Sequence, residues 1–255
     1  MRIALFAVLG LVIGSFLTVL IHRVPRRESI ARPGSRCPAC GTPLRWVDNV
    51  PVLSYLLLGG RCRACGEPIS IEYPLVELGS AALFVAAALV YEDLFRAALV
   101  ASFLGLMLAV AVIDARFRIV PNRIVYPALL IFAVAIVVGD LAGAEVDAPR
   151  AGLGMLAYSL PLFLIALAVP QGMGMGDVKL VTLVGLVLGS LGLAYVAVAA
   201  GVGIVAGGLG ALVAVVALRY GRKHQMPFGP FLAGGGAMAA LVGPQIASAY
   251  LSLLR

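Results

Sequence analysis

Eight long apolar runs constrain this chain more than any other feature of its sequence. In chain order they cover residues 3–21, 74–91, 96–113, 124–138, 151–169, 178–189, 191–218 and 229–253. A membrane-spanning helix needs about 20 predominantly apolar residues. Only 12% of the residues are charged, against about 25% in soluble domains. The sequence therefore predicts an all-α polytopic membrane protein with about eight transmembrane helices.

Three of these runs leave questions open about the helices they form. The sixth and seventh are separated only by Gly189 and Ser190, and joining this region differently gives seven spans. The first run is expected to be a permanent anchor, because it lacks a convincing small-residue cleavage site. It holds Gly10 and Gly14 at a spacing that lets helices approach closely. Chance explains that spacing equally well in a chain with 30 glycines.

The basic residues indicate how the chain is oriented in a membrane. One side holds eight arginines between Arg23 and Arg63, together with Arg116, Arg118, Arg123, Lys179, Arg219, Arg222 and Lys223. The other side holds Arg2, Arg96, Arg150 and Arg255. The positive-inside rule places the richer side in the cytoplasm and both termini outside. Orientation in a lipid bilayer thus accounts for the net charge of +7, and no nucleic-acid partner is expected.

The only long polar segment follows the first run and contains all four cysteines. They form two CxxC pairs separated by 21 residues: Cys37 and Cys40, then Cys62 and Cys65. Two such turns can supply four thiolates to one tetrahedral zinc ion. The cytoplasm keeps thiols reduced, which favours structural zinc over the alternatives of a disulfide, redox thiols or free thiols. A four-thiolate site leaves no open position for water, so this metal is expected to fold the segment and not to catalyse.

Two aspartates stand at the ends of apolar runs on the same predicted face of the membrane. Asp114 ends the third run, and Asp177 begins the sixth after a glycine-rich stretch that starts at Gly172. A charged residue at the centre of a membrane helix costs about 2.5–3.5 kcal/mol, so such groups need a reason to be kept. Two adjacent carboxyl groups cannot both ionise easily, and the pair can activate water and protonate a leaving amine. We therefore interpret Asp114 and Asp177 as a hydrolytic dyad.

The two aspartates and the glycine-rich stretch each have an alternative interpretation. Each aspartate can simply be solvated at a helix end, and the glycines resemble a phosphate loop. A phosphate loop would need a Gly-Lys-Ser/Thr sequence and a preceding soluble strand, which are missing here. Gly174 and Gly176 instead suit the approach of a peptide backbone. Lys179 is interpreted as an interfacial anchor. Glu77 lies near the start of the second run, where an ionisable group costs free energy and so is expected to have a use.

With these residues in view, the chain closely resembles the bacterial prepilin peptidases, which are GxGD-type membrane aspartic proteases. The resemblance rests on stretches that occur in the family's order: 14–25, 35–40, 48–54, 60–65, 73–77, Asp114 with Pro121 and Asn122, 174–179 and 227–231. The chain departs from the common pattern at Thr18, His22 and Arg61. The resemblance covers nearly the whole sequence.

The resemblance implies an endopeptidase in the bacterial cytoplasmic (inner) membrane that removes leader peptides from type IV prepilins and pseudopilins of type II secretion. Asp114 and Asp177 would be catalytic, supported by Gly174, Gly176 and Lys179. It also implies N-methylation of the new terminus with S-adenosylmethionine, at residues that the sequence leaves unknown. Three parts are expected: a first helix (1–21), a zinc-binding loop domain (22–73) and a seven-helix protease domain (74–255).

Two other functions remain open at the level of sequence. One is a membrane scaffold whose zinc knuckle docks a cytoplasmic partner while the aspartates are merely solvated. The other is a transporter with a proton relay, although both acids lie at one face and no inverted repeat is visible. Local acids, namely Asp48, Glu67, Glu72 or Glu77, are expected to guide a basic leader. The oligomeric state is not indicated.

Overall fold

The computed structural model describes residues 1–169, 174–216 and 227–253. Within these ranges the chain is helical and contains no strand, apart from two isolated bridges in the polar segment. The long helices are α1 (Arg2–Arg23), α3 (Glu72–Val90), α4 (Leu94–Phe117), α5 (Asn122–Leu141), α6 (Ala148–Ala168), α7 (Met175–Leu191), α8 (Leu193–Val216) and α9 (Gly229–Leu253). The start of the glycine-rich stretch at Gly172 and the basic residues Arg219, Arg222, Lys223 and Arg255 lie outside the described residues.

The long helices agree with the prediction of a multi-pass membrane protein. Seven of them are long and apolar enough to cross a membrane, and α7 is shorter at 17 residues. The sequence predicts the break between the sixth and seventh runs at Gly189 and Ser190. In the structure, the break between α7 and α8 falls at Gly192 instead. Gly192 has φ 142° and ψ 149°, a backbone conformation that is essentially restricted to glycine. The apolar pattern alone could not distinguish this glycine from the others nearby.

Glycines let neighbouring helices approach closely at two seams. A Cβ atom on Gly10 of α1 would lie 2.6 Å from the Cα of Ala81, and one on Gly14 would lie 2.7 Å from the Cα of Glu77. The spacing of these two glycines is therefore a packing motif, and α1 rests directly on α3 through it. Gly154 of α6 meets Gly185 of α7 in the same way, because a Cβ atom on Gly154 would lie 2.6 Å from the carbonyl oxygen of Gly185. Such contacts suit membrane helices, where packing replaces the hydrophobic effect.

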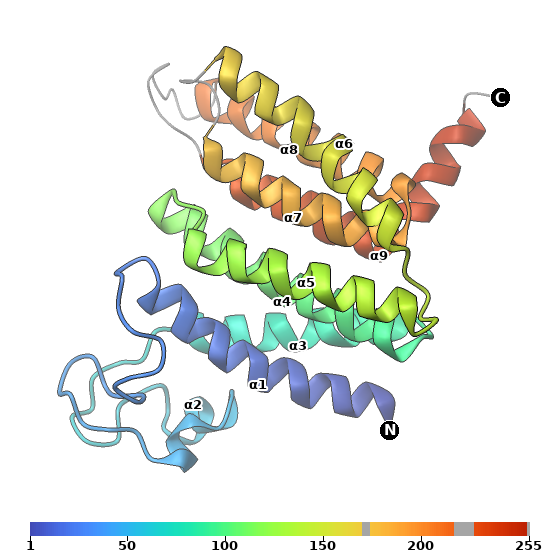
Figure 1. The fold of residues 1–255 in the computed structure, drawn as a ribbon. Coiled ribbons are helices and arrows are strands. Elements are labelled where there is room, and N and C mark those ends of the chain that lie inside the picture. Colours follow the sequence, from blue (N-terminus) through green and yellow to red (C-terminus); the bar gives the residue numbers. More distant parts are fainter. Residues whose placement is uncertain (170–173, 217–226, 254–255) are drawn as a thin grey trace.

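Helix α4 lies at the centre of the bundle and ends at the functional end of the molecule. Its large side chains Phe103, Leu104 and Met107 are buried, and it packs against α1, α3 and α9. Figure 1 shows that the end of α4 and the start of α7 lie at one end of the bundle. The polar segment, with η1 (Trp46–Asn49) and α2 (Leu53–Leu57), lies beyond α1 and α3 at that same end.

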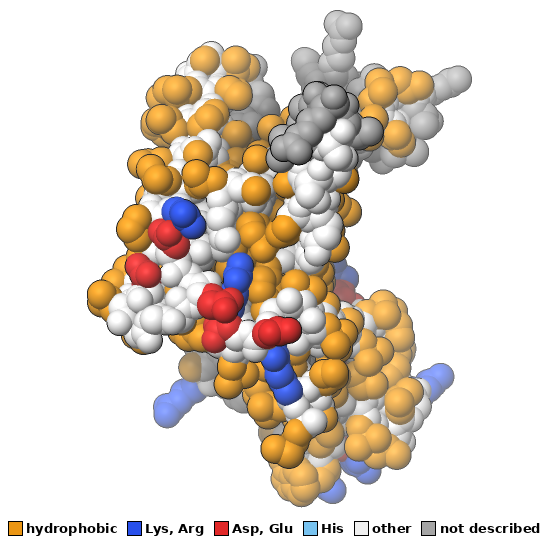
Figure 2. Space-filling model, turned by 90° about the vertical axis from the view of Figure 1, so that its right-hand side faces the viewer, with side chains coloured by type: hydrophobic (Ala, Val, Ile, Leu, Met, Phe, Trp, Pro, Cys, Tyr) orange, Lys and Arg blue, Asp and Glu red, His pale blue; other side chains and the backbone are white. Residues whose placement is uncertain are grey.

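The opposite end of the bundle has a different charge pattern. Figure 2 shows acidic side chains gathered there among apolar ones. Ion pairs near these chain turns join Arg96 to Glu145 at 3.1 Å and Arg150 to Asp147 at 3.2 Å. Glu145 and Asp147 lie in the turn between α5 and α6 at this end. The two ends are therefore chemically distinct, as expected for a protein with a fixed orientation.

Candidate active site

Asp114 lies near the C-terminal end of α4 and is held by a backbone group from the far end of the chain. Its side chain is buried. The N–H of Gly229 donates a hydrogen bond of 2.9 Å to its Oδ2 atom. A buried carboxylate needs such donors, because an unpaired buried charge is costly. The first residue of α9 therefore fixes the position of a carboxyl group on α4.

Gly229 must be glycine for this contact to exist. A Cβ atom at this position would lie 2.6 Å from Oδ2 of Asp114 and 2.9 Å from its Cγ. Any side chain would push the carboxyl group away or displace the start of α9. Within the stretch 227–231, which carries part of the family resemblance, Gly229 is thus in direct contact with Asp114.

Asp177 lies in the first turn of α7, where the helix dipole favours a negative group. Its N–H donates to the carbonyl oxygen of Gly174 at 3.0 Å. Gly176 packs against Val120, and a Cβ atom there would lie 3.1 Å from the Cβ of that residue. This close approach brings the start of α7 to the segment that follows α4. Asp114 and Asp177 are consequently near enough to interact electrostatically.

The two glycines before Asp177 thus differ in what they do. Gly176 is half-buried and is required by packing, whereas Gly174 is exposed and caps the helix. Sequence reasoning assigned both of them to the approach of a peptide backbone. Only Gly174 presents a free surface for that purpose.

Lys179 has specific partners on α5. Its Nζ donates to Oδ1 of Asn122 at 3.0 Å and lies 5.3 Å from the centre of the Tyr126 ring. The ammonium group therefore fastens the first turns of α7 and α5 to each other. Its proximity to Asp177 was visible in the sequence, but Asn122 as its partner was not.

The four cysteines come together as the spacing predicted. Their sulfur atoms all lie within 4.8 Å of one another, and Sγ of Cys37 is 3.9 Å from Sγ of Cys65. A tetrahedral zinc site with Zn–S bonds of about 2.3 Å places its sulfurs roughly 3.8 Å apart. The cluster is therefore suited to hold one metal ion.

The two CxxC turns have matching backbone structures. The N–H of Gly41 donates to the carbonyl of Cys37, and that of Gly66 donates to the carbonyl of Cys62, both at 2.9 Å. Both glycines have positive φ, 70° and 74°, which is the left-handed region that glycine adopts without strain. Each turn therefore presents its two thiols in the same way.

Hydrogen bonds with the hydroxyl and backbone of Thr42 lower the pKa of the Cys40 thiol to about 6. This favours the thiolate form that binds metal. Four thiolates at these distances repel one another, and a divalent cation would offset that repulsion.

Comparison with known proteins identifies the family to which these features belong. Residues 8–91 match the bacterial peptidase A24 N-terminal domain, and residues 101–218 match the type IV leader peptidase family. The chain belongs to the type IV leader peptidase family. No solved structure gives a significant match.

Curated relatives resemble the chain over nearly its whole length. A protein of Bacillus subtilis (strain 168) is 35% identical over 98% of each chain. One of Pseudomonas putida is 34% identical over 99% of this chain and 94% of its own. One of Burkholderia pseudomallei (strain 1026b) is 36% identical over 95% and 86%. All three are named prepilin leader peptidase/N-methyltransferase.

The family matches divide the site residues between two stretches. The N-terminal match contains most of α1, the cysteine cluster and α3, while the second contains both aspartates. Gly229 lies beyond residue 218, where the second match ends. The hydrogen bond to Asp114 therefore comes from a part of the chain that neither family match covers.

Glu77 of α3 ties the polar segment to the membrane helices. It is buried, and its Oε2 accepts a hydrogen bond of 2.7 Å from the N–H of Val52. Val52 has φ 60°, which is a genuine outlier for a β-branched residue. Gly14 of α1 packs against the backbone of Glu77. The sequence indicates that an acid at this place costs free energy, and the structure shows that this acid holds the backbone of Val52 in the polar segment.

Two acids that were expected to guide a substrate leader are paired within the protein. Asp48 forms an ion pair of 2.7 Å with Arg63, whose hydrogen bond lowers the pKa of this carboxyl group. Glu72 pairs with Arg116, which joins the start of α3 to the end of α4. Their charges are thus committed to internal contacts, and the guiding role expected for them is not supported.

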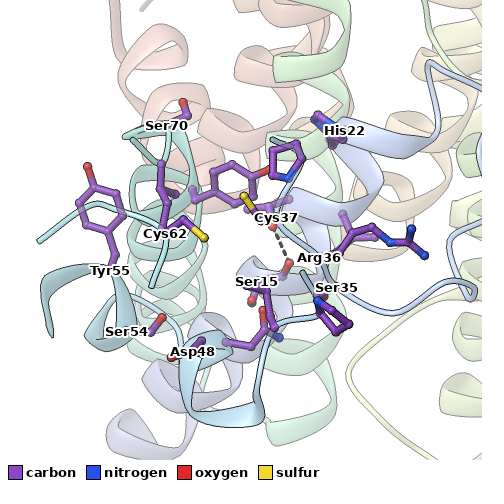
Figure 3. Close-up of a pocket in the computed structure, with 18 of the residues that line it drawn as sticks. Ser15, His22, Ser35, Arg36, Cys37, Asp48, Ser54, Tyr55, Cys62 and Ser70 are labelled. Carbon is purple, nitrogen blue, oxygen red and sulfur yellow. Dashed lines mark hydrogen bonds between the residues drawn. The ribbon is translucent and has the colours of Figure 1, made fainter. Parts of the chain in front are cut away.

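A cavity of about 1060 Å³ lies between the polar segment, α1 and α3. Figure 3 shows Cys37 and Cys62 on one side of it, with Asp48 and Ser54 of the same segment across from them. His22 lines it from the end of α1, and Arg116 lines it from the end of α4. The cavity thus extends from the cysteine cluster to Arg116, near the end of α4.

Proposed function

We propose that this protein is a membrane aspartic endopeptidase that cleaves the leader peptide of type IV prepilins or pseudopilins at the cytoplasmic face. The relatives are named as prepilin leader peptidases and N-methyltransferases. The observation that supports the proposal is that Asp114, near the end of α4, and Asp177, in the first turn of α7, lie at the same end of the bundle, where the N–H of Gly229 holds the first of them.

The two carboxyl groups have complementary tasks in this proposal. One is ionised and takes a proton from a water molecule, whose oxygen attacks the carbonyl carbon of the scissile peptide. The other holds a proton and donates it as the C–N bond breaks and the amine leaves. The N–H of Gly229 holds Asp114 in place, and Lys179 and Asn122 hold the helix start that carries Asp177.

The position of the site suits a substrate anchored by its own helix. In this proposal the protein lies in the bacterial inner membrane, and its basic polar segment faces the cytoplasm. A prepilin held in the same bilayer presents its leader on that face. Shared anchoring raises the effective concentration of the leader at the aspartates, as tethering does.

The four cysteines are proposed to hold a structural zinc ion. Cys37, Cys40, Cys62 and Cys65 would supply all four ligands, which leaves no position open for a catalytic water. The polar segment has only short helices, η1 and α2, and neither contains a buried residue. A metal ion would supply the stability that such a segment cannot obtain from a core of its own.

The second reaction is proposed to use S-adenosylmethionine. When bound, this cofactor supplies a methyl group carried on a sulfonium. The new amine forms an N–C bond as the C–S bond breaks, and the nitrogen releases a proton. The protein would bring the donor near the end where the amine is formed.

Cleavage of a purified prepilin tests the peptidase. Wild-type protein, Asp114→Asn and Asp177→Asn are incubated with the prepilin in lipid, and the mass of the product is followed over time. Both variants are expected to lose at least about 1,000-fold in rate, because each removes one partner of the acid–base pair.

Lys179→Met serves as a control for damage to the start of α7. It removes the bond to Asn122 but leaves both carboxyl groups in place, so a smaller loss is expected. Cleavage at the normal rate by either aspartate variant contradicts the dyad. No cleavage by the wild-type protein would favour the scaffold hypothesis, in which the polar segment only docks a partner.

A further inference from the structure

The middle of the polar segment is itself apolar. The segment holds eight arginines between Arg23 and Arg63, yet residues 46–60 contain no basic residue and a single acidic one, Asp48. That carboxyl group is paired with Arg63. Charged side chains are rare at membrane depth because they are costly there. Residues 46–60 thus have the composition of a membrane-facing element within a segment that is otherwise strongly basic.

Helix α2, in this stretch, has one apolar face, and that face is exposed. Leu53, Leu56 and Leu57 stand at positions i, i+3 and i+4, which share one side of a helix. The last two are 68% and 76% exposed. Ser54 and Tyr55 instead line the cavity between the segment and α1. The three leucines therefore form an apolar surface that needs a partner other than water.

The depth of α2 along the membrane helices indicates what covers this surface. Val52, which precedes α2, donates its N–H to Glu77, and the backbone of Glu77 lies against Gly14. Gly14 is nine residues before the end of α1 at Arg23, which is about 14 Å along a helix. The glutamate side chain is short compared with that distance, so Val52 lies well inside the length of α1.

Two views of the molecule agree with this depth. Figure 1 shows the polar segment turning back from the end of α1, so that α2 lies beside that helix. In Figure 3, Ser54 of α2 lies toward Ser15, near the middle of α1, and away from His22 at its end. Phe16 of α1 is an exposed apolar side chain near the same level. Helix α2 is therefore beside a part of α1 that is suited to lipid.

The backbone of the stretch has its partners within the protein, as a bilayer requires. Pro51 has no N–H, and the N–H of Val52 donates to Glu77. The N–H groups of Ser54 and Leu56 donate to backbone carbonyls, both at 3.0 Å. At membrane depth such partners must come from the protein, and irregular backbone is tolerated where it lines a cavity. Glu77 thus supplies the acceptor that water would supply in a cytoplasmic loop.

We propose that α2 is a re-entrant element whose leucine face lies in the lipid of the bilayer leaflet beside α1 and α3. Its five residues are too few to span, and the chain turns back at Gly59 and Gly60, with φ 59° and 68°. Trp46 of η1, which packs against α2, is 83% exposed, and tryptophan is the residue type that anchors proteins at the membrane interface. A water-soluble partner could not reach the leucines at this depth without displacing lipid. This placement of α2 holds whichever reaction the aspartates catalyse.

The fluorescence of Trp46 tests the proposal without a label, because it is the only tryptophan in the chain. Full-length protein is placed in nanodiscs of phosphatidylcholine and phosphatidylglycerol, with either ordinary or brominated acyl chains, and iodide is added to the water. Trp46 is expected to lose most of its emission in the brominated lipid and little of it to iodide. Strong quenching by iodide with none by the brominated lipid overturns the proposal, because the surface would then face water and be open to a protein partner.

Moving the tryptophan shows which face meets the lipid. In a Trp46→Phe background, Leu57→Trp places the probe on the apolar face, and Ala39→Trp places it on an exposed turn of the cysteine cluster as the matched control. The first should be quenched by the brominated lipid and the second by iodide. Equal quenching of the two by the brominated lipid also overturns the proposal, because lipid contact would not be particular to α2. The measurement on the unsubstituted protein decides the matter even where a variant fails to fold.

Discussion

The cysteine cluster and the aspartate site lie at the same end of the molecule, but they are built in opposite ways. The cysteine cluster consists of two similar turns within one short segment, each closed by its own backbone hydrogen bond. The aspartate site joins α4, α7 and the start of α9, and its Gly229–Asp114 bond spans 115 positions in the chain. One site is local, and the other depends on how the whole bundle packs.

This difference predicts how each site fails. A local cluster can be lost while the helices around it stay folded, because few of its contacts reach beyond the segment. A site made of three helices depends on every seam that aligns them. The experiments below test whether the two sites are as separable as their construction suggests.

The largest effect is expected from Cys37→Ser. Loss of one thiolate should reduce bound zinc from about one ion per chain to almost none, because structural zinc needs all four ligands. Zinc-binding free energies of about 10–16 kcal/mol in small domains indicate how much folding then depends on the ion. Metal analysis and limited proteolysis between residues 22 and 73 measure the outcome.

Ala39→Ser is the control, because this exposed residue lies in the same turn and offers no ligand in the cluster. It should retain zinc. If Cys37→Ser also lowers the melting temperature of the membrane helices strongly, the cluster is not local in its effect and the comparison fails.

Sequence reasoning succeeded where the pattern is local. The apolar runs gave the helices, and the CxxC spacing predicted the cysteine cluster that the structure contains. Placing Asp114 and Asp177 at one face needed only the alternation of spans. Catalysis by Asp114 and Asp177 stays a prediction, which the rates of the two aspartate variants test.

The remaining features depend on contacts between segments that the sequence does not pair. Nothing in the run after residue 227 identifies which backbone N–H will meet Asp114. Likewise, the sequence does not indicate that Glu77 and Val52 are partners, because their hydrogen bond joins a membrane helix to an irregular segment. The break at Gly192 was also missed, since φ cannot be read from composition.

A smaller effect is expected from Gly229→Ala. The added Cβ would lie 2.6 Å from Oδ2 of Asp114, so the carboxyl group or the start of α9 must move. A misplacement of about 1 Å can cost roughly 100-fold in rate. We expect a loss of about that size in kcat for prepilin cleavage, with bound zinc unchanged.

Gly234→Ala is its matched control on the same helix, because a Cβ there meets nothing within 4 Å. This variant should cleave at nearly the wild-type rate. Equal losses in both variants would mean that α9 as a whole is sensitive, and that the contact with Asp114 is not special.

The smallest effect is expected from Glu77→Leu, which tests the connection between the two regions. The substitution removes the acceptor for the N–H of Val52, and leaving a buried donor unpaired costs about 1–3 kcal/mol. Glu77→Gln retains an amide oxygen at the same place and should cost less. Hydrogen exchange at residues 50–55 should therefore become faster in the leucine variant and change little in the glutamine variant.

Because Glu77 holds the segment and not the aspartates, the cleavage rate of Glu77→Leu should fall less than that of Gly229→Ala. A larger fall would show that docking of the polar segment controls the aspartate site, and the two regions would then have to be treated as one.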